Sequence, residues 1–199
     1  MKDEIEVKFV EVSVLDIQAK LKSINAELIY KNRLMKRAIM DFPDKLLDKS
    51  DSFVRVRDEG NKITLTYKKF ESYSVSGAKE IETVVESFDQ TIKIFEAIGL
   101  EVLSMQESKR ETWKLDNCVI EIDEWPWLKP YIEIEGNSEE ELKAIASKLG
   151  LDWSKAIFGD VMVAYQTQYP WLLPTQSVVD LKEVKFGSPL PDFLILNKS

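Results

Sequence analysis

The 199-residue sequence contains no histidine and only one cysteine, Cys118. A single cysteine cannot form an intramolecular disulfide, and its alternation with Ile120 and Ile122 predicts a buried structural thiol. The absence of histidine excludes Ser-His-Asp and Cys-His nucleophilic catalysis, histidine proton transfer and the usual Cys/His zinc sites. Polar chemistry must therefore come from carboxylates, lysines, arginines and hydroxyl groups.

Long apolar runs and glycine-rich loops are also missing. No stretch approaches the roughly 18 consecutive apolar residues of a membrane-spanning helix, and the N-terminus lacks the apolar segment of a signal peptide. The seven glycines are scattered and form neither GxxxxGK nor GxGxxG, so a P-loop or a dinucleotide-binding fold is not supported. We expect a cytoplasmic protein that does not bind membranes.

The charge balance is acidic, with 35 acidic residues, 27 basic residues and a net charge of −8. This balance disfavours a general affinity for nucleic-acid backbones, although it is compatible with basic residues concentrated inside a cavity. The length fits one domain with one substantial core. We expect a monomer or homodimer without a nucleic-acid partner.

Alternation of apolar and polar residues with period two recurs along the first two-thirds of the chain and predicts strands. The segments are 4–9, 52–56, 62–68, 79–85, 106–114, 119–123 and 131–135. Turn residues at 58–61 and 115–117 lie where antiparallel hairpins would close. The pattern predicts a meander of seven or eight strands, and the strand around 29–41 has an ambiguous register.

Helices interrupt these strands, and three of them have capping boxes. The capping pairs are Ser13 with Asp16, Ser87 with Gln90, and Ser138 with Glu141. The second and third helices should end at Gly99 and Gly150, and a fourth is predicted from Ser154 to about Gln168. We expect residues 1–170 to form the main domain, and 171–199 a C-terminal extension packed on it.

Almost every predicted strand has one apolar and one charged face. The helices need the apolar faces to bury their own apolar stripes, so the charged faces point either to water or into a closed barrel. For Glu4, Glu6 and Lys8 alone, a solvated face is the simpler interpretation. The recurrence of arginine and glutamate pairs at spacing two favours a barrel of about eight strands, which can enclose one small ligand.

Such a cavity would combine basic and acidic side chains. Arginines and lysines bind phosphate oxygens, and carboxylates bind Mg²⁺ or Mn²⁺, which usually share ligands with substrate phosphates. The basic set is Lys8, Arg55, Arg57, Lys68 and Arg110, and the acidic set is Glu4, Glu6, Glu80, Glu82, Asp123, Glu133 and Glu135. The combination predicts a polyphosphate held by bases and bridged to acids by a metal ion.

The opening motif Glu4-x-Glu6-x-Lys8, followed in order by FVRVR, TLTYK, KEIE, KR, IEIDEW and YIEIEG, resembles the CYTH proteins, the triphosphate tunnel metalloenzymes. This family includes thiamine triphosphatases, inorganic triphosphatases and CyaB-type adenylate cyclases. The resemblance covers about residues 2–150 and, more loosely, the helix to about 168. It implies an α+β fold: a closed eight-stranded antiparallel β-barrel, or tunnel, with helices packed on the outside.

The resemblance also implies roles for individual residues. The implied triphosphate-binding residues are Lys8, Arg55, Arg57, Lys68 and Arg110. The implied metal ligands for Mg²⁺ or Mn²⁺ are Glu4, Glu6, Asp123, Glu133 and Glu135, with Asp123 preferred to Glu121. Glu4, Glu6 and Lys8 would be catalytic, and Glu80 and Glu82 would be supporting acids of the inner wall. Lys36 or Arg37 would add to the basic wall.

Two features depart from the family pattern. Trp125 and Trp127 lie in a segment rich in Trp and Pro, where they would rim the tunnel mouth or, as the simpler interpretation has it, pack under the hairpin. The C-terminal lysine assigned to catalysis in some thiamine triphosphatases has no secure match. Lys155, Lys182 and Lys185 are the candidates.

The favoured function is metal-dependent hydrolysis of a small-molecule triphosphate: inorganic tripolyphosphate, or an organic one such as thiamine triphosphate or a nucleotide. The first alternative is a CyaB-type adenylate cyclase, which makes cyclic AMP and pyrophosphate from ATP. The second is a non-catalytic module that binds polyphosphate or nucleotide.

Overall fold

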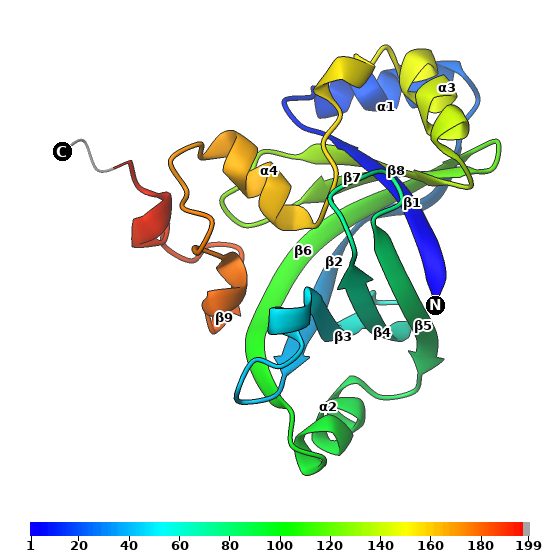
Figure 1. Cartoon of the computed structure of the whole chain (residues 1–199). Coiled ribbons are helices and arrows are strands. Elements are labelled where there is room, and N and C mark those ends of the chain that lie inside the picture. The colour runs from blue at the N-terminus through cyan, green and yellow to red at the C-terminus, as the bar shows by residue number, and fades with distance from the viewer. Residues whose placement is uncertain (197–199) are drawn as a thin grey trace.

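Eight antiparallel strands close into a ring in the computed structural model, which describes residues 1–196 (Figure 1). They are β1 Lys2–Phe9, β2 Glu27–Asp41, β3 Ser52–Asp58, β4 Ile63–Phe70, β5 Ala78–Val85, β6 Glu101–Leu115, β7 Cys118–Glu124 and β8 Tyr131–Gly136. Neighbours follow the order β2-β3-β4-β5-β1-β8-β7-β6, and β6 also pairs with β2, which closes the barrel. The predicted α+β fold with a closed eight-stranded barrel is confirmed.

The period-two alternation separates an inner from an outer face in each strand. In β3, Val54 and Val56 are buried on the outer face, whereas Arg55 and Arg57 point inward. The register with β4 places Arg55 opposite Thr66 and continues the polar inner row around the ring. Most strands follow this rule, although Ile39 of β2 also lines the cavity, so the interior of the barrel is mainly polar and the apolar core lies outside it.

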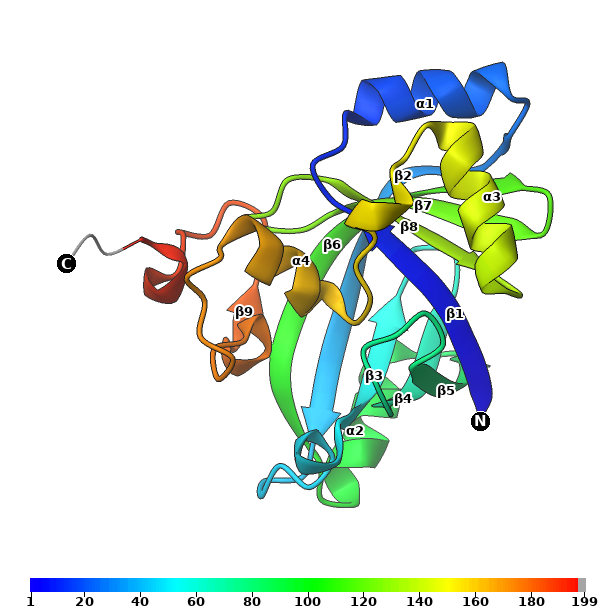
Figure 2. The same ribbon diagram turned by 45° about the horizontal axis from the view of Figure 1, so that its top comes forward.

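Four helices cover parts of the outer face (Figures 1 and 2). They are α1 Val14–Ser23, α2 Phe88–Ala97, α3 Glu139–Leu149 and α4 Val161–Gln168. The side chains of Ser13, Ser87 and Ser138 accept hydrogen bonds from the backbone amides three residues on, as the capping boxes predict. α1 and α3 pack over β1, β7 and β8, and α2 lies at the other end of the barrel against β3 and β6.

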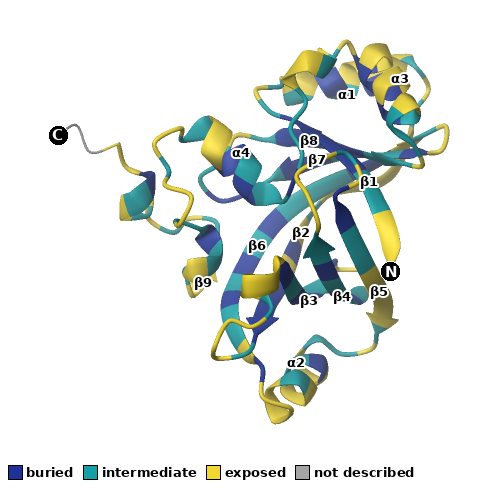
Figure 3. Cartoon of the chain, in the orientation of Figure 1, coloured by how far each residue is buried: buried dark blue, intermediate teal, exposed yellow. Residues whose placement is uncertain are grey.

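The outer wall is not covered evenly (Figure 3). Ile120, Ile132 and Leu142 are fully buried where α3 packs on β7 and β8. The second half of β5 is exposed instead, and Ile81 and Val84 keep 56% and 66% of their surface in solvent. The two sides of the barrel therefore differ in how firmly the helices support them.

The fourth helix begins later than predicted. Residues Trp153–Lys155 form a 3₁₀ turn, Ile157 makes an isolated bridge with Lys8, and Gly159 has a φ of 127°. That left-handed backbone cannot continue a helix, so α4 starts only after the Asp160 cap, whose side chain accepts a hydrogen bond from Met162 N. The prediction of a helix from Ser154 was wrong at its start and correct at its end.

The chain after α4 lies against the barrel. A short strand, β9 Glu183–Val184, pairs parallel with β6, and Ser104 Oγ donates a hydrogen bond to Leu181 O at 2.6 Å. Val178, Val184 and Leu194 are buried in a cluster with Trp125 and Tyr165, which also includes Trp127. The last three residues of the predicted extension, 197–199, lie outside the described residues. Within 1–196, no helix is long and apolar enough to cross a membrane.

Candidate active site

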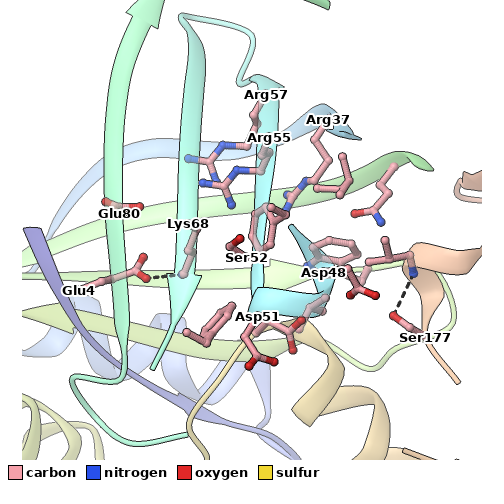
Figure 4. Close-up of a pocket in the computed structure, with 18 of the residues that line it drawn as sticks. Glu4, Arg37, Asp48, Asp51, Ser52, Arg55, Arg57, Lys68, Glu80 and Ser177 are labelled. Atoms are coloured by element: carbon pink, nitrogen blue, oxygen red, sulfur yellow. Dashed lines mark hydrogen bonds and ion pairs between the residues drawn. The ribbon is translucent and has the colours of Figure 1, made fainter. Parts of the chain in front are cut away.

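A cavity of about 670 Å³ lies inside the barrel. It is lined by these residues of the predicted site: Glu4, Glu6, Lys8, Arg55, Arg57, Lys68, Glu80, Glu82, Arg110, Glu133 and Glu135. Asp123 is not among the lining residues and is 1% exposed. In Figure 4, Glu4 and Glu80 lie on one side of Lys68, and the arginines lie on the other.

The acidic side of the cavity holds two buried lysines. Lys8 Nζ lies 2.7 Å from Glu6 Oε1 and 3.1 Å from Glu133 Oε2. Lys68 Nζ pairs with Glu4 (dashed in Figure 4) and lies 3.8 Å from Glu6 Oε1. These contacts follow from the strand register, because β8 places Glu133 opposite Lys8.

The carboxylates of this side still outnumber the lysines, and the pKa values of three of them are raised. Burial and the charge of Glu133 raise the pKa of Glu6 to about 7, against the opposing effect of Lys8. Burial and the neighbouring charge of Glu4 also raise the pKa values of Glu80 and Glu135. A further cation on this side would be stabilised by the uncompensated carboxylates.

The acidic side fits a hard divalent cation that shares its ligands with a substrate. Within residues 1–196, no group of three or more Asp, Glu or Cys side chains converges into a complete metal site. Mg²⁺ usually takes only one or two protein carboxylates and completes its shell with water and substrate phosphates. Glu4 Oε2 is buried, pairs with Lys68 and has no further hydrogen-bond partner among residues 1–196. The donor chemistry is therefore suitable, and a phosphate ligand would supply what the protein does not.

Arginines from two neighbouring strands form the opposite side, which we call the arginine wall: Arg37 of β2 with Arg55 and Arg57 of β3 (Figure 4). Arg57 Nη2 lies 2.7 Å from Glu59 Oε1, whereas the nearest carboxylate oxygen recorded for Arg55, on Glu82, is 3.8 Å away. Burial and the charge of Arg57 lower the pKa of Arg55 to about 10. Positive charge is in excess here, which suits an anionic ligand.

Arg110 of β6 joins the two sides of the cavity. Its guanidinium donates to both oxygens of Asp123, at 2.6 and 2.5 Å, and pairs with Glu121 and, at 3.5 Å, with Glu133. A metal role for Asp123 would require this pair to open, so that assignment stays a prediction. Glu121 does line the cavity, and burial raises its pKa to about 7 against the opposing charge of Arg110.

Glu59 is a site residue that the sequence interpretation missed. It is 5% exposed and lies within 3.8 Å of Arg57, Arg33 and Lys62. Although burial opposes it, the charge of Arg57 holds the pKa of Glu59 below its usual range. Its position continues the period-two row of Arg55 and Arg57, but the turn signal of residues 58–61 hid this continuation.

The structure separates the remaining candidates. The pairing of Ala38 with Val56 puts Arg37 on the inner face, and Lys36 is exposed. Trp125 lines the cavity and is 4% exposed, whereas Trp127 Nε1 donates to Ser188 O of the C-terminal extension. None of the three lysine candidates of the C-terminal region is among the lining residues: Lys155, Lys182 and Lys185.

The C-terminal extension contributes to one end of the cavity. Its lining residues are Pro174, Thr175, Ser177, Val179 and Asp180. Asp180 Oδ1 lies 3.0 Å from Lys45 Nζ in the loop between β2 and β3. Two segments far apart in the sequence therefore meet at this end, which we call the mouth.

Known proteins of the same architecture match the chain. The family model described as the CYTH domain matches residues 2–156. A search of curated proteins finds no significant match, whereas 50 chains of solved structures match. One is a candidate adenylate cyclase from Vibrio parahaemolyticus, with a TM-score of 0.71 and 16% identity over 82% of this chain and 97% of that one.

Two other structures show the same fold. The PH1012 protein from Pyrococcus horikoshii OT3 has a TM-score of 0.65 and 24% identity, over 77% of this chain and 93% of that one. A candidate adenylyl cyclase from Hippeastrum, described with a dominant triphosphatase activity, has a TM-score of 0.58 and 17% identity, over 87% of this chain and 98% of that one. Because the family model spans well over half of the sequence, the chain belongs to the CYTH domain family, whose enzymes act on triphosphates with divalent metal ions.

Proposed function

We propose that this protein is a triphosphatase that hydrolyses a phosphoanhydride bond of a small-molecule triphosphate with Mg²⁺ or Mn²⁺. One observation carries the proposal: one cavity inside the barrel places the arginine wall opposite a row of carboxylates. A polyphosphate needs cationic donors for its oxygens, and its metal ion needs carboxylates at a short distance. The two sides of the cavity supply these two requirements.

The basic residues bind and orient the phosphate chain. Arg55 and Arg57 project from alternate positions of one rigid strand, so both guanidiniums face the same volume. Arg110 is held by Asp123 and faces the cavity between the arginine wall and the acidic side. Phosphoryl transfer depends mainly on such positioning and on neutralising the charge of non-bridging oxygens. Lys8 and Lys68 lie where the acidic side begins and complete the positive surface.

The acidic residues would hold the metal ion and the attacking water. Glu133 and Glu135 would bind the ion together with the substrate, and Glu4 lies beside them in the cavity. When bound, a divalent ion neutralises phosphate charge and lowers the pKa of water. Glu6 lines the same side of the cavity and is suited to take the proton of the attacking water.

A phosphate-release assay tests the proposal. Tripolyphosphate, ATP and thiamine triphosphate are each incubated with the protein, with and without Mg²⁺ or Mn²⁺, and orthophosphate is measured. We expect release from at least one substrate, dependent on the metal. Tight binding without turnover in any metal would indicate the non-catalytic module, and neither binding nor turnover would refute the proposal.

Adenylate cyclase is the second candidate function. The likeness in fold to the Vibrio parahaemolyticus protein motivates it. The cavity also extends to Phe53, Phe70 and Tyr73, which offer aromatic surface to a nucleoside. In this reaction the 3′-hydroxyl of ATP attacks the α-phosphorus and pyrophosphate leaves. Cyclic AMP formed from ATP without orthophosphate would decide for the cyclase.

A further inference from the structure

We infer that Arg37 and Trp125 form an anion subsite of the cavity that binds a phosphoryl group of the substrate, in addition to the triphosphate-binding set of Lys8, Arg55, Arg57, Lys68 and Arg110. The inference deepens the proposed function and rests on it for the nature of the ligand. Arg37 lies on β2 and Trp125 follows β7, and both line the cavity.

Arg37 differs from every other cation of the cavity. The other lining cations each have a carboxylate oxygen within 4.0 Å: Lys8, Lys45, Arg55, Arg57, Lys62, Lys68 and Arg110. For Arg37, which is 5% exposed, the described residues provide no such ion pair. A buried charge without a counterion is costly, so a site that keeps one is suited to an anion from solution.

The local contacts hold the guanidinium and leave donors unused. Its carbon lies 4.3 Å from the centre of the Trp125 ring, so the indole supports one face of the group. Nη2 donates to Ser108 Oγ at 2.5 Å, whereas Nε is buried and has no partner among residues 1–196. Trp125 Nε1 is also buried without a partner in that part of the chain. Two residues that line the cavity, each more than nine-tenths buried, therefore carry a donor without a partner among residues 1–196.

The neighbouring charges make an anion the suitable ligand. The pairing of β2 with β3 places Arg37 directly opposite Arg57, and Arg55 is the neighbouring inward-facing residue of β3. Burial and the charges of these two arginines lower the pKa of Arg37 well below its usual value. A phosphoryl group that bridges the three guanidiniums would relieve this repulsion, and stacking on Trp125 leaves the edge of Arg37 available for a forked hydrogen bond.

A purely structural role for Arg37 makes a different prediction for the empty protein. If Arg37 mainly supported the fold through Ser108 and Trp125, Arg37→Gln would lower the melting temperature without ligand. If it is an uncompensated cation kept for an anion, the same change should leave that temperature unchanged or raise it. A structural role therefore predicts lower stability with unchanged affinity for polyphosphate. The subsite predicts weaker binding of polyphosphate with unchanged or higher stability of the ligand-free protein.

The test measures binding of tripolyphosphate and orthophosphate by calorimetry, together with thermal melts in phosphate-free buffer. For Arg37→Gln we expect tripolyphosphate to bind roughly 10- to 100-fold more weakly, since a hydrogen bond to a charged group is lost. Trp125→Phe keeps the stacking ring and removes Nε1, so its affinity should fall by about 2- to 10-fold. Lys36→Gln, which removes an exposed charge at the adjacent position, is the matched control and should bind like wild type.

The outcomes separate this inference from the proposed function. A wild-type protein that binds no tripolyphosphate refutes both. Wild-type binding with unchanged affinity in Arg37→Gln and Trp125→Phe refutes only the subsite, as does a fall in the melting temperature of Arg37→Gln with unchanged affinity. If Arg37→Gln does not fold, Arg37→Lys retains the charge without the fork, and its weaker binding in a protein as stable as wild type supports the subsite.

Discussion

The two sides of the cavity neutralise their charges in different ways. On the acidic side, Lys8 and Lys68 lie between carboxylates at hydrogen-bonding distance, and the remaining excess is negative. On the arginine wall, Arg37 has no carboxylate within 4.0 Å among the described residues, Arg55 has only Glu82 at 3.8 Å, and the excess is positive. One side of the cavity therefore carries an excess of negative charge, and the other side carries an excess of positive charge.

This difference explains why a metal ion and a polyphosphate would bind together. Each side alone would require a counterion, because uncompensated charges in a poorly hydrated site cost free energy. A polyphosphate with its divalent ion presents both signs in one ligand, with oxygens for the arginines and a cation for the carboxylates. Selectivity for such a complex then follows from the separation of the two sides.

Removal of the metal should have the largest effect. It changes only the acidic side, but the hydrolysis step depends on the ion held there. We expect dialysis against a chelator to abolish phosphate release and Mg²⁺ or Mn²⁺ to restore it. Tripolyphosphate should still bind, more weakly, through the arginines, and calorimetry of the metal-free protein measures this. Undiminished turnover in excess chelator would show that the carboxylates do not serve a metal.

Loss of the two β3 residues of the arginine wall should have the next largest effect. Removing one preorganised donor to transition-state charge costs about 10²- to 10³-fold, so the double variant Arg55→Gln/Arg57→Gln should lower kcat/KM by at least about 10³-fold. Lys69→Gln, on the outer face of β4, is the control. A loss of less than tenfold in a folded double variant would assign phosphate binding elsewhere in the cavity.

The pH dependence of stability tests the excess of carboxylate charge in the cavity without a substrate. Glu6 and Glu121 have pKa values raised to about 7, so the folded protein binds more protons than the unfolded chain between about pH 4.5 and 7. Their contribution to stability is present below the ordinary glutamate pKa and is lost as the pH rises through 7. The melting temperature of the ligand-free protein should therefore fall from pH 5 to pH 8.

Two variants and one opposing effect complete this prediction. Glu6→Gln and Glu121→Gln should each flatten the decline. The lowered pKa values of Glu59 and Glu133 act in the opposite direction, but only below the ordinary glutamate pKa, because that stability is lost as pH falls through their folded values. A melting temperature that rises between pH 5 and 8 would contradict the assignment of excess carboxylate charge.

The ion pair at the mouth should matter least. Lys45 and Asp180 are half exposed, and pairs of this kind contribute about 0.2–1 kcal/mol. Lys45→Met should therefore lower the free energy of unfolding by at most about 1 kcal/mol and change kcat/KM by no more than about fivefold. Urea titration and steady-state kinetics measure the two quantities. A much larger kinetic effect would make the mouth part of substrate recognition.

Much of the fold could be predicted because its determinants are local. Alternation with period two identified the inner row of β1 and β3, and the capping serines located three helices. The rows containing Glu4, Glu6 and Lys8, and Arg55 and Arg57, followed directly, since neighbours two apart must share a face. The late start of α4 was not predicted, because the bridge between Ile157 and Lys8 is a long-range contact.

The sequence by itself determined which side chains share one face of a strand. The tertiary structure decided which charged side chains find partners. Strand pairing put Arg37 rather than Lys36 inside, engaged Asp123 with Arg110 while Glu121 faces the cavity, and brought Glu59 to Arg33. These outcomes depend on how one strand pairs with its neighbours. Periodicity is a property of one strand, whereas neutralisation of charge is a property of the closed barrel.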